Sequence, residues 1–357
     1  AYAKANGRAN SVIVFQEPFG FNFIDYELAR QGIDGTSNVV ECLMRVLAAA
    51  DHATGNGGKA SGDRFWEDAP RQILNYTVPI VYAAWGNVTV QMIIDFVMSS
   101  ATTPKQWDDP HWLSNSFAAQ TIQRVAVSPA VAISDSQLRT IISYWNTQYT
   151  RIPEKTLGNI IISMTTRLDR FNHGRLHKAF CQGTSIVPEM TFQGMIIIMN
   201  MPTLTWNEDG IIGQHLFKFM WQRAVEARNG MDITQQQRPV FLWADEAQNF
   251  VSSYDFIYQS VCRSARGITV YLTQNISNYY ALLGNRDQAN SLLGNFQNKV
   301  FHANADAPTN AYASEVIASA MVSLGSGGAS TNPEGERSTS INVSQSLQPK
   351  VLPAEFT

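Results

Sequence analysis

The sequence has 357 residues, of which 45% are hydrophobic, and this length suggests two domains or one large domain with an insertion. Its formal net charge of −3 excludes a global basic surface for nucleic acid, so any such contact would need local patches. No apolar run reaches the roughly 18 residues of a membrane-spanning helix, and the three distant cysteines argue against a disulfide framework.

Short β-rich runs alternate with helical stretches along much of the chain. Each run is followed by a turn or helix signal, and helical stretches such as residues 213–228 and 253–264 lie between the later ones. Alternation with short links indicates an α/β fold with a parallel sheet and right-handed crossovers. The predicted strands are residues 11–15, 195–199, 240–243, 268–273 and 299–302.

From residue 65 onward, the interval between the first two predicted strands is mostly helical in pattern. Ser134, followed by Asp135 and Ser136, is a plausible helix start. An all-helical insertion within an α/β domain is the simplest account, with the insertion at residues 65–179 and the α/β domain at residues 1–64 and 180–357. The predicted helices of the insertion are residues 65–85, 88–98, 112–125, 134–149 and 159–170.

The C-terminal part has a different composition. Residues 325–340 are rich in Gly, Ser, Thr and Asn, which predicts a mobile loop. Residues 339–348 then alternate weakly between polar and apolar side chains, as an edge strand would.

Residues 239–250 are the most informative stretch. The apolar run 240–243 predicts a strand that helices cover on both faces. It ends in Asp245 and Glu246, and ligands of open α/β sheets bind outside the carboxyl ends of the strands. This is the form of a Walker B element, in which one carboxylate holds the Mg²⁺ shell on a nucleotide and the other orients the attacking water. The bare pattern is equally compatible with an ordinary strand followed by an acidic turn.

The residues around the next strand could complete such a site. Gln274 and Asn275 end that strand, where an amide can hydrogen-bond a terminal phosphate, although such amides more often satisfy the backbone of a turn. Arg263 and Arg266 precede the strand, and an arginine finger that reaches a phosphate across a subunit boundary stabilises the charge that develops in phosphoryl transfer. The alternative is a helix end at which arginine offsets the dipole and Gly267 is the C′ cap.

His173, His177 and Cys181 have the spacing of one helical face. A zinc site needs three or four ligands, and Gly174 weakens the helix, so we disfavour a metal site here. The basic residues around these three could contact a phosphate backbone, although a solvated helix face is more common. These basic residues are Arg167, Arg170, Arg175 and Lys178.

Residues 55–61 superficially resemble a phosphate-binding loop. The loop pattern G-x-x-x-x-G-K-[ST] requires glycine where Ala53 stands and serine or threonine where Ala60 follows the lysine. No predicted strand precedes the segment. We therefore reject it as a Walker A loop, and the sequence carries no Walker A lysine.

Several motifs taken together resemble the type IV secretion coupling proteins, the hexameric DNA-pump ATPases of conjugation. The resemblance covers nearly the whole chain and implies a RecA-like P-loop NTPase motor domain interrupted by an all-α domain. In the family, the all-α domain faces the cytosol and helps to receive relaxosome or protein cargo. The matching motifs are Phe-Asn-Phe-Ile-Asp at 21–25, Phe-Trp-Glu-Asp-Ala at 65–69, Trp-Ala-Asp-Glu-Ala-Gln-Asn-Phe at 243–250, Arg-Ser-Ala-Arg-Gly at 263–267, Thr-Gln-Asn at 273–275 and Leu-Leu-Gly-Asn at 292–295.

The resemblance also implies roles for particular residues, with ATP and Mg²⁺ as the cofactors. Asp245 and Glu246 correspond to the Walker B acids, and Asp245 holds Mg²⁺ through water. Gln274 corresponds to the phosphate-sensing glutamine, so Asp245 and Gln274 are the expected contacts to the bound nucleotide. Arg263 is our first choice for the arginine finger, and Arg266 is the second.

The partners implied by the resemblance are single-stranded DNA, relaxase and relaxosome proteins and the ATPases of the type IV secretion channel. The expected assembly is a homo-hexamer at the cytoplasmic face of the bacterial inner membrane. The family's Walker A loop lies upstream of the first strand predicted here, and its membrane helices lie further upstream. Neither is in this sequence, so we expect an excised fragment or a degenerate relative that hydrolyses little ATP by itself.

Three function hypotheses remain, in decreasing order. The first is the motor core of a coupling ATPase that moves single-stranded DNA or a DNA-linked protein. The second is a non-hydrolysing module that binds relaxosome or secretion partners through the helical insertion. The third is a hydrolase that uses Asp245 and Glu246 as an acid–base pair. Adjacent residues at a strand end point in different directions, whereas glycosidase carboxyl groups must face each other, so we disfavour the third hypothesis.

Overall fold

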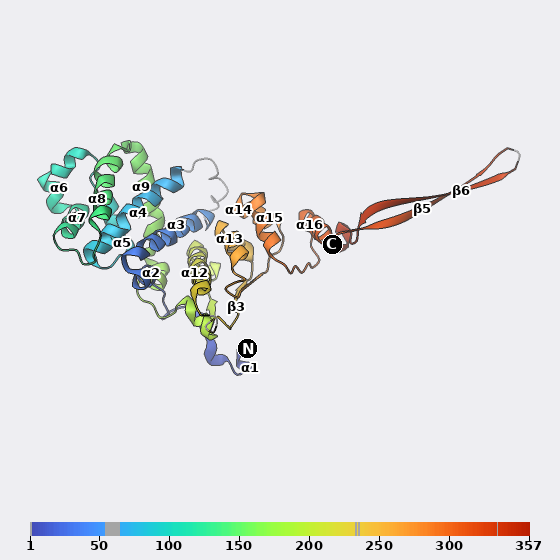
Figure 1. Ribbon diagram of the computed structural model, residues 1–357, viewed down its shortest axis with the longest axis horizontal. Helices are drawn as coiled ribbons and strands as arrows, with labels where there is room; N and C mark the ends of the chain where they lie inside the picture. The colour runs from blue at the N-terminus through green and yellow to red at the C-terminus, as the bar shows by residue number, and fades with distance from the viewer. Residues whose placement is uncertain (1, 54–64, 233, 235, 334) are drawn as a thin grey trace.

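The computed structural model describes residues 2–53, 65–232, 234, 236–333 and 335–357. A helical mass lies at one side, a mixed region of helices and strands lies in the middle, and a long ribbon of two strands projects from the other side (Figure 1). Residues 55–61, which we rejected as a phosphate loop, lie outside the described residues.

The helices are α1 Tyr2–Ala5, α2 Phe23–Gln31, α3 Thr36–Ala53, α4 Phe65–Trp85, α5 Val90–Ser99, α6 Pro110–Asn115, α7 Phe117–Val127, α8 Asp135–Ser143, α9 Glu154–Leu168, α10 Gly174–Phe180, α11 Thr203–Trp206, α12 Glu208–Ala227, α13 Ser253–Val261, α14 Ser277–Leu283, α15 Arg286–Asn295 and α16 Ala307–Ile317. The strands are β1 Val12–Phe15, β2 Ile196–Met199, β3 Val240–Ala244, β4 Gly267–Tyr271, β5 Ser319–Thr331 and β6 Arg337–Pro349.

Residues 65–179, the predicted insertion, contain helices α4 to α9 and most of α10. Figure 1 shows α4 to α9 gathered in one helical mass. Local sequence explains their ends. Ser134 caps α8, because its hydroxyl accepts from the Gln137 N–H while the Gln137 side chain returns to the Ser134 backbone, as a capping box requires. The predicted helix 112–125 is two helices instead, because Ser116 ends α6 and its hydroxyl caps α7.

Aromatic side chains fill the core of the helical mass. Trp145 and Tyr149 are almost fully buried, with ring centroids 4.5 Å apart, and Phe96 meets Trp145 edge to face at 5.1 Å. The Trp145 indole N–H donates to the Tyr76 carbonyl, so its polar atom is satisfied. Each such ring stabilises the fold by roughly 1.5–3 kcal/mol through burial. No single helix among the described residues is long and apolar enough to cross a bilayer; α4 and α5 meet both conditions only together, as a pair bent by 110°.

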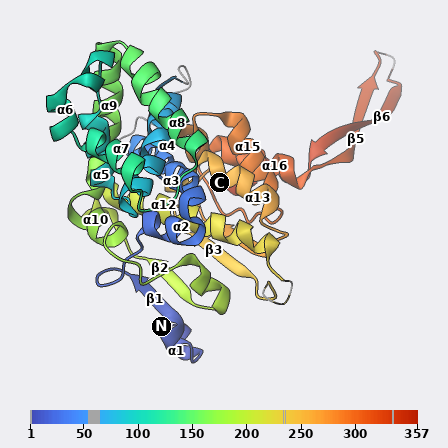
Figure 2. The same ribbon diagram turned by 60° about the vertical axis from the view of Figure 1, so that its left-hand side comes forward.

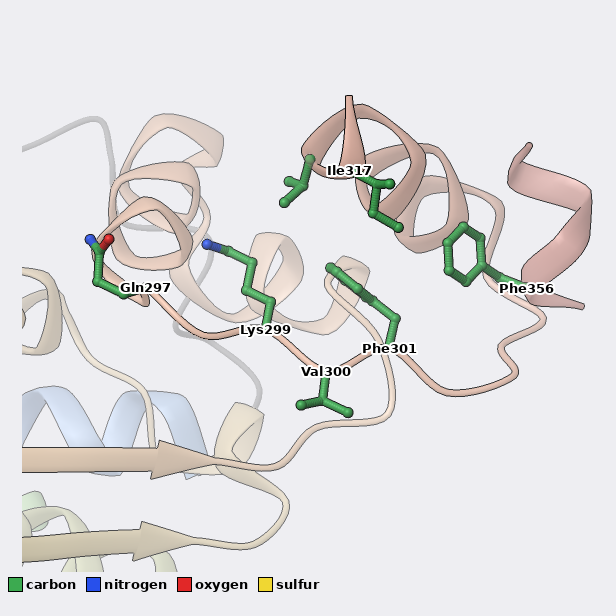
Figure 3. Close-up of a pocket in the computed structure, with 7 residues that line it drawn as sticks. Gln297, Lys299, Val300, Phe301, Ile317 and Phe356 are labelled. Carbon is green, nitrogen blue, oxygen red and sulfur yellow. The ribbon is translucent and has the colours of Figure 1, made fainter. Parts of the chain in front are cut away.

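The first four strands pair in parallel, as predicted, but in the part of the chain that the structure describes they form two separate pairs and not one continuous sheet. β1 pairs with β2, and β3 pairs with β4, from Val240 opposite Gly267 to Ala244 opposite Tyr271. The prediction of a strand at residues 299–302 is wrong, because this segment pairs with no strand in the described part of the chain. Its side chains alternate, with Lys299 and Phe301 on one side and Val300 on the other, yet its backbone forms no ladder (Figure 3).

The prediction that helices cover β3 on both faces is also wrong. Val240 is 2% exposed, but Phe241 and Trp243 are 50% and 66% exposed. One face of β3 therefore packs on the helices behind it, while the other is open in this chain. An uninterrupted apolar run cannot distinguish a strand with two covered faces from a strand with one covered face.

The prediction of a mobile loop at residues 325–340 is wrong as well. β5 and β6 form a long antiparallel ribbon whose register runs from Ser319 opposite Pro349 to Thr331 opposite Arg337 (Figure 1). Gly, Ser and Thr accept the extended backbone, and regular ladder pairing outweighed their turn propensity. The predicted strand at residues 339–348 is confirmed within β6.

Helix α12 connects the helical mass to the part that carries the second strand pair. It lies along α3 on one side and contacts α13 on the other (Figure 2). Leu216, Met220 and Val225 are among its buried side chains. Because α12 is buried on most of its circumference, it provides a rigid support behind β3 and β4.

Candidate functional site

The two predicted acids lie at the carboxyl end of β3, beside the carboxyl end of β4. Ala244 is the last residue of β3 and lies opposite Tyr271, the last residue of β4. Asp245 and Glu246 directly follow Ala244, and Gln274 follows Tyr271 by three residues, so all three leave the strand pair at the same edge. Parallel strands end at one edge, and this edge is where α/β proteins bind ligands. The structure therefore brings Asp245, Glu246 and Gln274 together, as the sequence predicts.

Glu246 has the most constrained geometry at this edge. Its φ is +49°, in the left-handed region that residues other than glycine rarely adopt. Its side chain accepts from Gln274 Nε2, 3.1 Å from Oε1 and 3.3 Å from Oε2, and from Gln248 Nε2 at Oε2. Its backbone N–H donates to Asp245 Oδ1 at 3.0 Å. Two side-chain amides from different loops thus donate to one carboxylate, that of a glutamate whose backbone is strained.

Gln248 and Thr273 belong to the site although the sequence did not single them out. Gln248 is nearly buried, and its Oε1 accepts from Thr273 Oγ1 at 2.8 Å. Gln248 follows Glu246 by two residues, and Thr273 precedes Gln274 directly. Their proximity to predicted site residues was the available signal, but only the folded loops show that the four side chains form one chain of hydrogen bonds.

Backbone hydrogen bonds tie the loop after the acids to the loop after β4. Ala247 N–H donates to the Leu272 carbonyl at 2.8 Å, and Leu272 N–H donates to the Ala244 carbonyl at 2.9 Å. From below, His215 Nε2 of α12 donates to the Asn249 carbonyl at 3.1 Å. The loop that carries Glu246 is therefore anchored on both sides.

A buried carboxylate network supports the same loop. Asp255 accepts from Lys218 Nζ at 2.6 Å, Gln222 Nε2 at 2.8 Å, the Tyr271 hydroxyl at 2.6 Å and the Ser252 N–H at 2.7 Å. It therefore joins α12, the start of α13 and the end of β4. Burial would raise the pKa of Asp255, but the Lys218 ammonium and the hydrogen bonds together outweigh it and hold this pKa below its usual range.

The acids fit a hydrated magnesium ion better than a protein-enclosed metal. Asp245 is exposed and Glu246 half-buried, and Mg²⁺ typically keeps several waters while one or two carboxylates and substrate phosphates complete its shell. Among the described residues, no group of three His, Cys, Asp or Glu side chains could hold a metal. Asp245 is therefore the residue that fits such an ion, through water.

The two candidate finger arginines lie at the opposite end of the strand pair. Arg263 and Arg266 precede β4, whose five residues span roughly 17 Å, whereas Gln274 follows it. Arg263 is exposed, and its side chain forms no hydrogen bond or ion pair with any residue that the structure describes, while Arg266 Nη1 donates to the Gln237 carbonyl at 2.7 Å. The structure does not bring either arginine to the acids of its own chain.

The expectation that Gly267 is the C′ cap of the preceding helix is wrong in one respect. The left-handed residue is Arg266, with φ +54°, and not Gly267. Gly267 is required for a different reason: a Cβ there would lie 2.7 Å from the Tyr258 hydroxyl and 3.0 Å from Val225 Cγ1. The glycine lets β4 approach the buried ring of Tyr258.

The other ligand pattern does not assemble. α10 begins at Gly174, with φ +62°, and ends at Phe180, so His173 and Cys181 lie outside the helix that would align them with His177. His177 Nδ1 lies 2.9 Å from the Phe171 carbonyl.

Most of the basic residues near this pattern are paired with acids. Arg167 lies 2.6 Å from Asp51, Arg170 contacts Glu208 and Asp209, and Lys178 lies 3.0 Å from Glu17. Arg175 lies over the Trp206 ring. An ion-paired surface explains the basic cluster without a nucleic acid.

Two hollows lie away from the acids. One, of about 460 Å³, is lined by Lys299, Phe301, Ile317 and Phe356 among others, with Phe301 pointing toward Ile317 (Figure 3). The other, of about 410 Å³, lies at the carboxyl ends of β1 and β2. Neither includes a predicted site residue.

Comparisons with known proteins point to one group. Residues 239–356 match the family model described as the TraM recognition site of TraD and TraG. This region includes both acids, Gln274 and the ribbon. No curated protein matches the chain.

The solved structures similar to this chain include three of one coupling protein. The unbound bacterial conjugative coupling protein TrwBdeltaN70 is 12% identical, with a TM-score of 0.54 over 98% of this chain and 69% of that chain. The plasmid coupling protein TrwB in complex with the GTP analogue GDPNP is 14% identical, with the same TM-score and coverage. Its complex with the ATP analogue ADPNP is 14% identical, with a TM-score of 0.54 over 98% of this chain and 68% of that chain.

At these identities the structural likeness establishes the fold, and the family model establishes the kinship of the C-terminal third. The resemblance inferred from the motifs is thereby confirmed: the chain is similar to the type IV secretion coupling proteins, with the recognition region of TraD and TraG at residues 239–356 and the fold of TrwB along its length.

Proposed function

We propose that this chain is the motor core of a conjugative coupling ATPase that uses ATP hydrolysis to move single-stranded DNA, or a DNA–protein substrate, across the inner membrane. The observation that carries the proposal is that two side-chain amides donate to the Glu246 carboxylate, next to the exposed Asp245. Both acids lie at the carboxyl end of a parallel strand pair. The GTP and ATP analogues bound to TrwB support a nucleoside triphosphate as the substrate class.

The proposed roles follow from position. Asp245, exposed at the strand end, holds the hydrated Mg²⁺, which when bound neutralises charge on the β- and γ-phosphates. Glu246, with its carboxylate fixed, orients the attacking water. The Gln274 amide lies beside Glu246, where it can contact a terminal phosphate. In this assignment, residues 1–64 and 180–357 form the RecA-like P-loop NTPase domain and residues 65–179 the all-α domain.

The proposal extends to the assembly. Arg263, exposed at the far end of β4, would serve as finger only for a neighbouring copy, so the motor would be a ring, and a homo-hexamer by resemblance. The proposed partners are single-stranded DNA, relaxase and relaxosome proteins and the secretion-channel ATPases, at the cytoplasmic face of the inner membrane. The match of residues 239–356 to a TraM recognition model supports a relaxosome-type partner.

Glu246→Gln tests the proposed chemistry in the protein expressed from its complete reading frame. The amide keeps the shape but cannot orient water as a carboxylate does, so we expect ATP binding to persist while kcat falls on the order of 100-fold or more. Steady-state phosphate release and binding of an ATP analogue measure the two quantities. The exposed Glu315→Gln is the matched control and should leave kcat unchanged. Normal turnover by Glu246→Gln would sink the assignment.

A second candidate function is a non-hydrolysing module that binds relaxosome partners. The match of residues 239–356 to a recognition model favours it. It would take first place if the unsubstituted protein bound its partners and an ATP analogue yet released no phosphate.

A further inference from the structure

Glu246 is held by two amides that differ in burial. Gln274 is exposed, whereas Gln248 is nearly buried. An exposed side chain can move to a ligand with little loss of contact, but a buried one has its orientation fixed by its surroundings. The two glutamines are therefore suited to different tasks.

The orientation of the Gln248 amide is set by its neighbour. Thr273 Oγ1 donates to Gln248 Oε1 at 2.8 Å, so the amide oxygen is occupied and the NH₂ group faces Glu246. A flipped amide would place its oxygen against the carboxylate and its NH₂ group against the hydroxyl. The direction of the hydrogen-bond chain thus runs from Thr273 through Gln248 to Glu246.

The two glutamines also favour different carboxylate oxygens. Gln248 donates to Oε2, whereas the shorter contact of Gln274 is to Oε1. A water that Glu246 orients needs one free carboxylate oxygen. Withdrawal of Gln274 to a terminal phosphate would expose Oε1, while Gln248 would still hold Oε2.

We propose that Gln248, oriented by Thr273, is the positioning residue for Glu246, and that Gln274 covers the water-orienting oxygen until a terminal phosphate draws it away. The inference rests on the proposed function and adds a means of control. Glu246 becomes free to orient water only when a terminal phosphate has taken the Gln274 amide, because the same amide serves the carboxylate and the phosphate. It also explains how a glutamate with a strained backbone keeps one side-chain orientation at an open strand end.

Three substitutions test the inference in the protein expressed from its complete reading frame. Gln248→Leu removes the donor, Thr273→Val removes the hydroxyl while keeping the shape, and Thr273→Ser keeps the hydroxyl. We expect Gln248→Leu to lower kcat on the order of 10-fold to 100-fold with KM for ATP within about twofold, because misplacement of a reacting group by a fraction of an ångström acts on turnover and not on nucleotide binding. Thr273→Val should lower kcat several-fold, and Thr273→Ser should restore it.

Controls separate this inference from a loss of folding and from failure of the proposed function. Gln120→Leu on the exposed face of α7 should leave kcat unchanged. Because Thr273 is exposed, its variants test the hydrogen-bond chain from Thr273 through Gln248 to Glu246 even if Gln248→Leu does not fold. If Glu246→Gln abolishes turnover but Thr273→Val keeps wild-type kcat, or lowers it only together with a raised KM, the positioning role is overturned and the proposed function stands. If Glu246→Gln itself turns over normally, both are overturned.

Discussion

Lys218 and Asp255 form an ion pair that water hardly reaches, with side-chain exposures of 6% and 0%. Two full charges in the interior are tolerated because Gln222, Tyr271 and Ser252 also donate to the carboxylate. The pair lies directly beneath the loop that carries Glu246, and Lys218 also donates to the Phe250 carbonyl. At the scale of the residue, this ion pair ties α12 to the loop that carries Glu246.

Lys218→Met should destabilise the protein by about 3–5 kcal/mol at neutral pH, because it leaves the Asp255 carboxylate buried without its cation. Urea unfolding followed by fluorescence measures the loss. The exposed Lys105→Met is the matched control and should change stability by less than about 0.5 kcal/mol. A loss below 1 kcal/mol for Lys218→Met would contradict a tightly coupled pair.

The pH dependence of this substitution has a definite sign. In the wild type, the lowered pKa of Asp255 supplies stability above the ordinary value near pH 4, and that stability is lost as pH falls through the lowered pKa. Without Lys218, burial raises the pKa of Asp255, so protonation begins at a higher pH and relieves the buried charge. The stability gap between wild type and Lys218→Met should therefore narrow as pH falls from 7 toward 4. A gap that widens would exclude this account.

At the scale of the element, two glycines show how context decides the effect of one methyl group. Gly267, at the first position of β4, has the Tyr258 hydroxyl and Val225 within 3.0 Å of a hypothetical Cβ. Gly158, inside α9, has no heavy atom within 4 Å of one apart from its chain neighbours and the backbone of its own helix. The first glycine permits a close contact between elements, whereas the second only weakens a helix.

Gly267→Ala should destabilise the protein by roughly 1–3 kcal/mol, because the buried ring of Tyr258 must shift. Gly158→Ala should stabilise it by about 0.5–1 kcal/mol, because alanine is the better helix former. Thermal unfolding of the two variants measures both effects against the wild type. Equal shifts of one sign would show that the two positions do not differ as the packing indicates.

At the scale of the whole molecule, the position of Arg263 separates it from the acids of its own chain. A finger at the amino end of β4 can act only on another copy, since the strand between it and Gln274 spans roughly 17 Å. Mixing subunits therefore tests the ring without knowledge of its size.

Arg263→Ala and Glu246→Gln should each hydrolyse ATP poorly, yet an equal mixture that exchanges subunits should recover roughly a quarter of the wild-type rate. Random placement makes about one interface in four pair an intact Arg263 with an intact Glu246. The rate of phosphate release over mixing ratio is the measurement, and mixing Arg266→Ala with Glu246→Gln tests the second candidate. No recovery with either arginine would remove both as fingers in trans.

The element types were largely predictable from local sequence. Four of the five predicted strands formed, and α4 ends at Trp85 as predicted, because apolar periodicity and caps such as Ser134 act over a few residues. The failures at residues 299–302 and 325–340 depend on pairing. Whether an extended segment becomes a strand depends on a partner strand, often distant in the chain, and the local pattern does not contain this information.

The sequence by itself determined the chemistry available at the site: two acids after an apolar run and a glutamine after the next one. These residues lie close together because β3 and β4 pair in parallel and end at the same edge. Only the tertiary structure decided that Gln248 and Gln274 share one carboxylate, that Lys218 neutralises the buried Asp255, and that Arg263 lies at the opposite end of β4 from its own acids. The physical reason is range: propensity and periodicity act between neighbours in the chain, whereas hydrogen-bond direction and charge pairing depend on where the folded backbone places distant side chains.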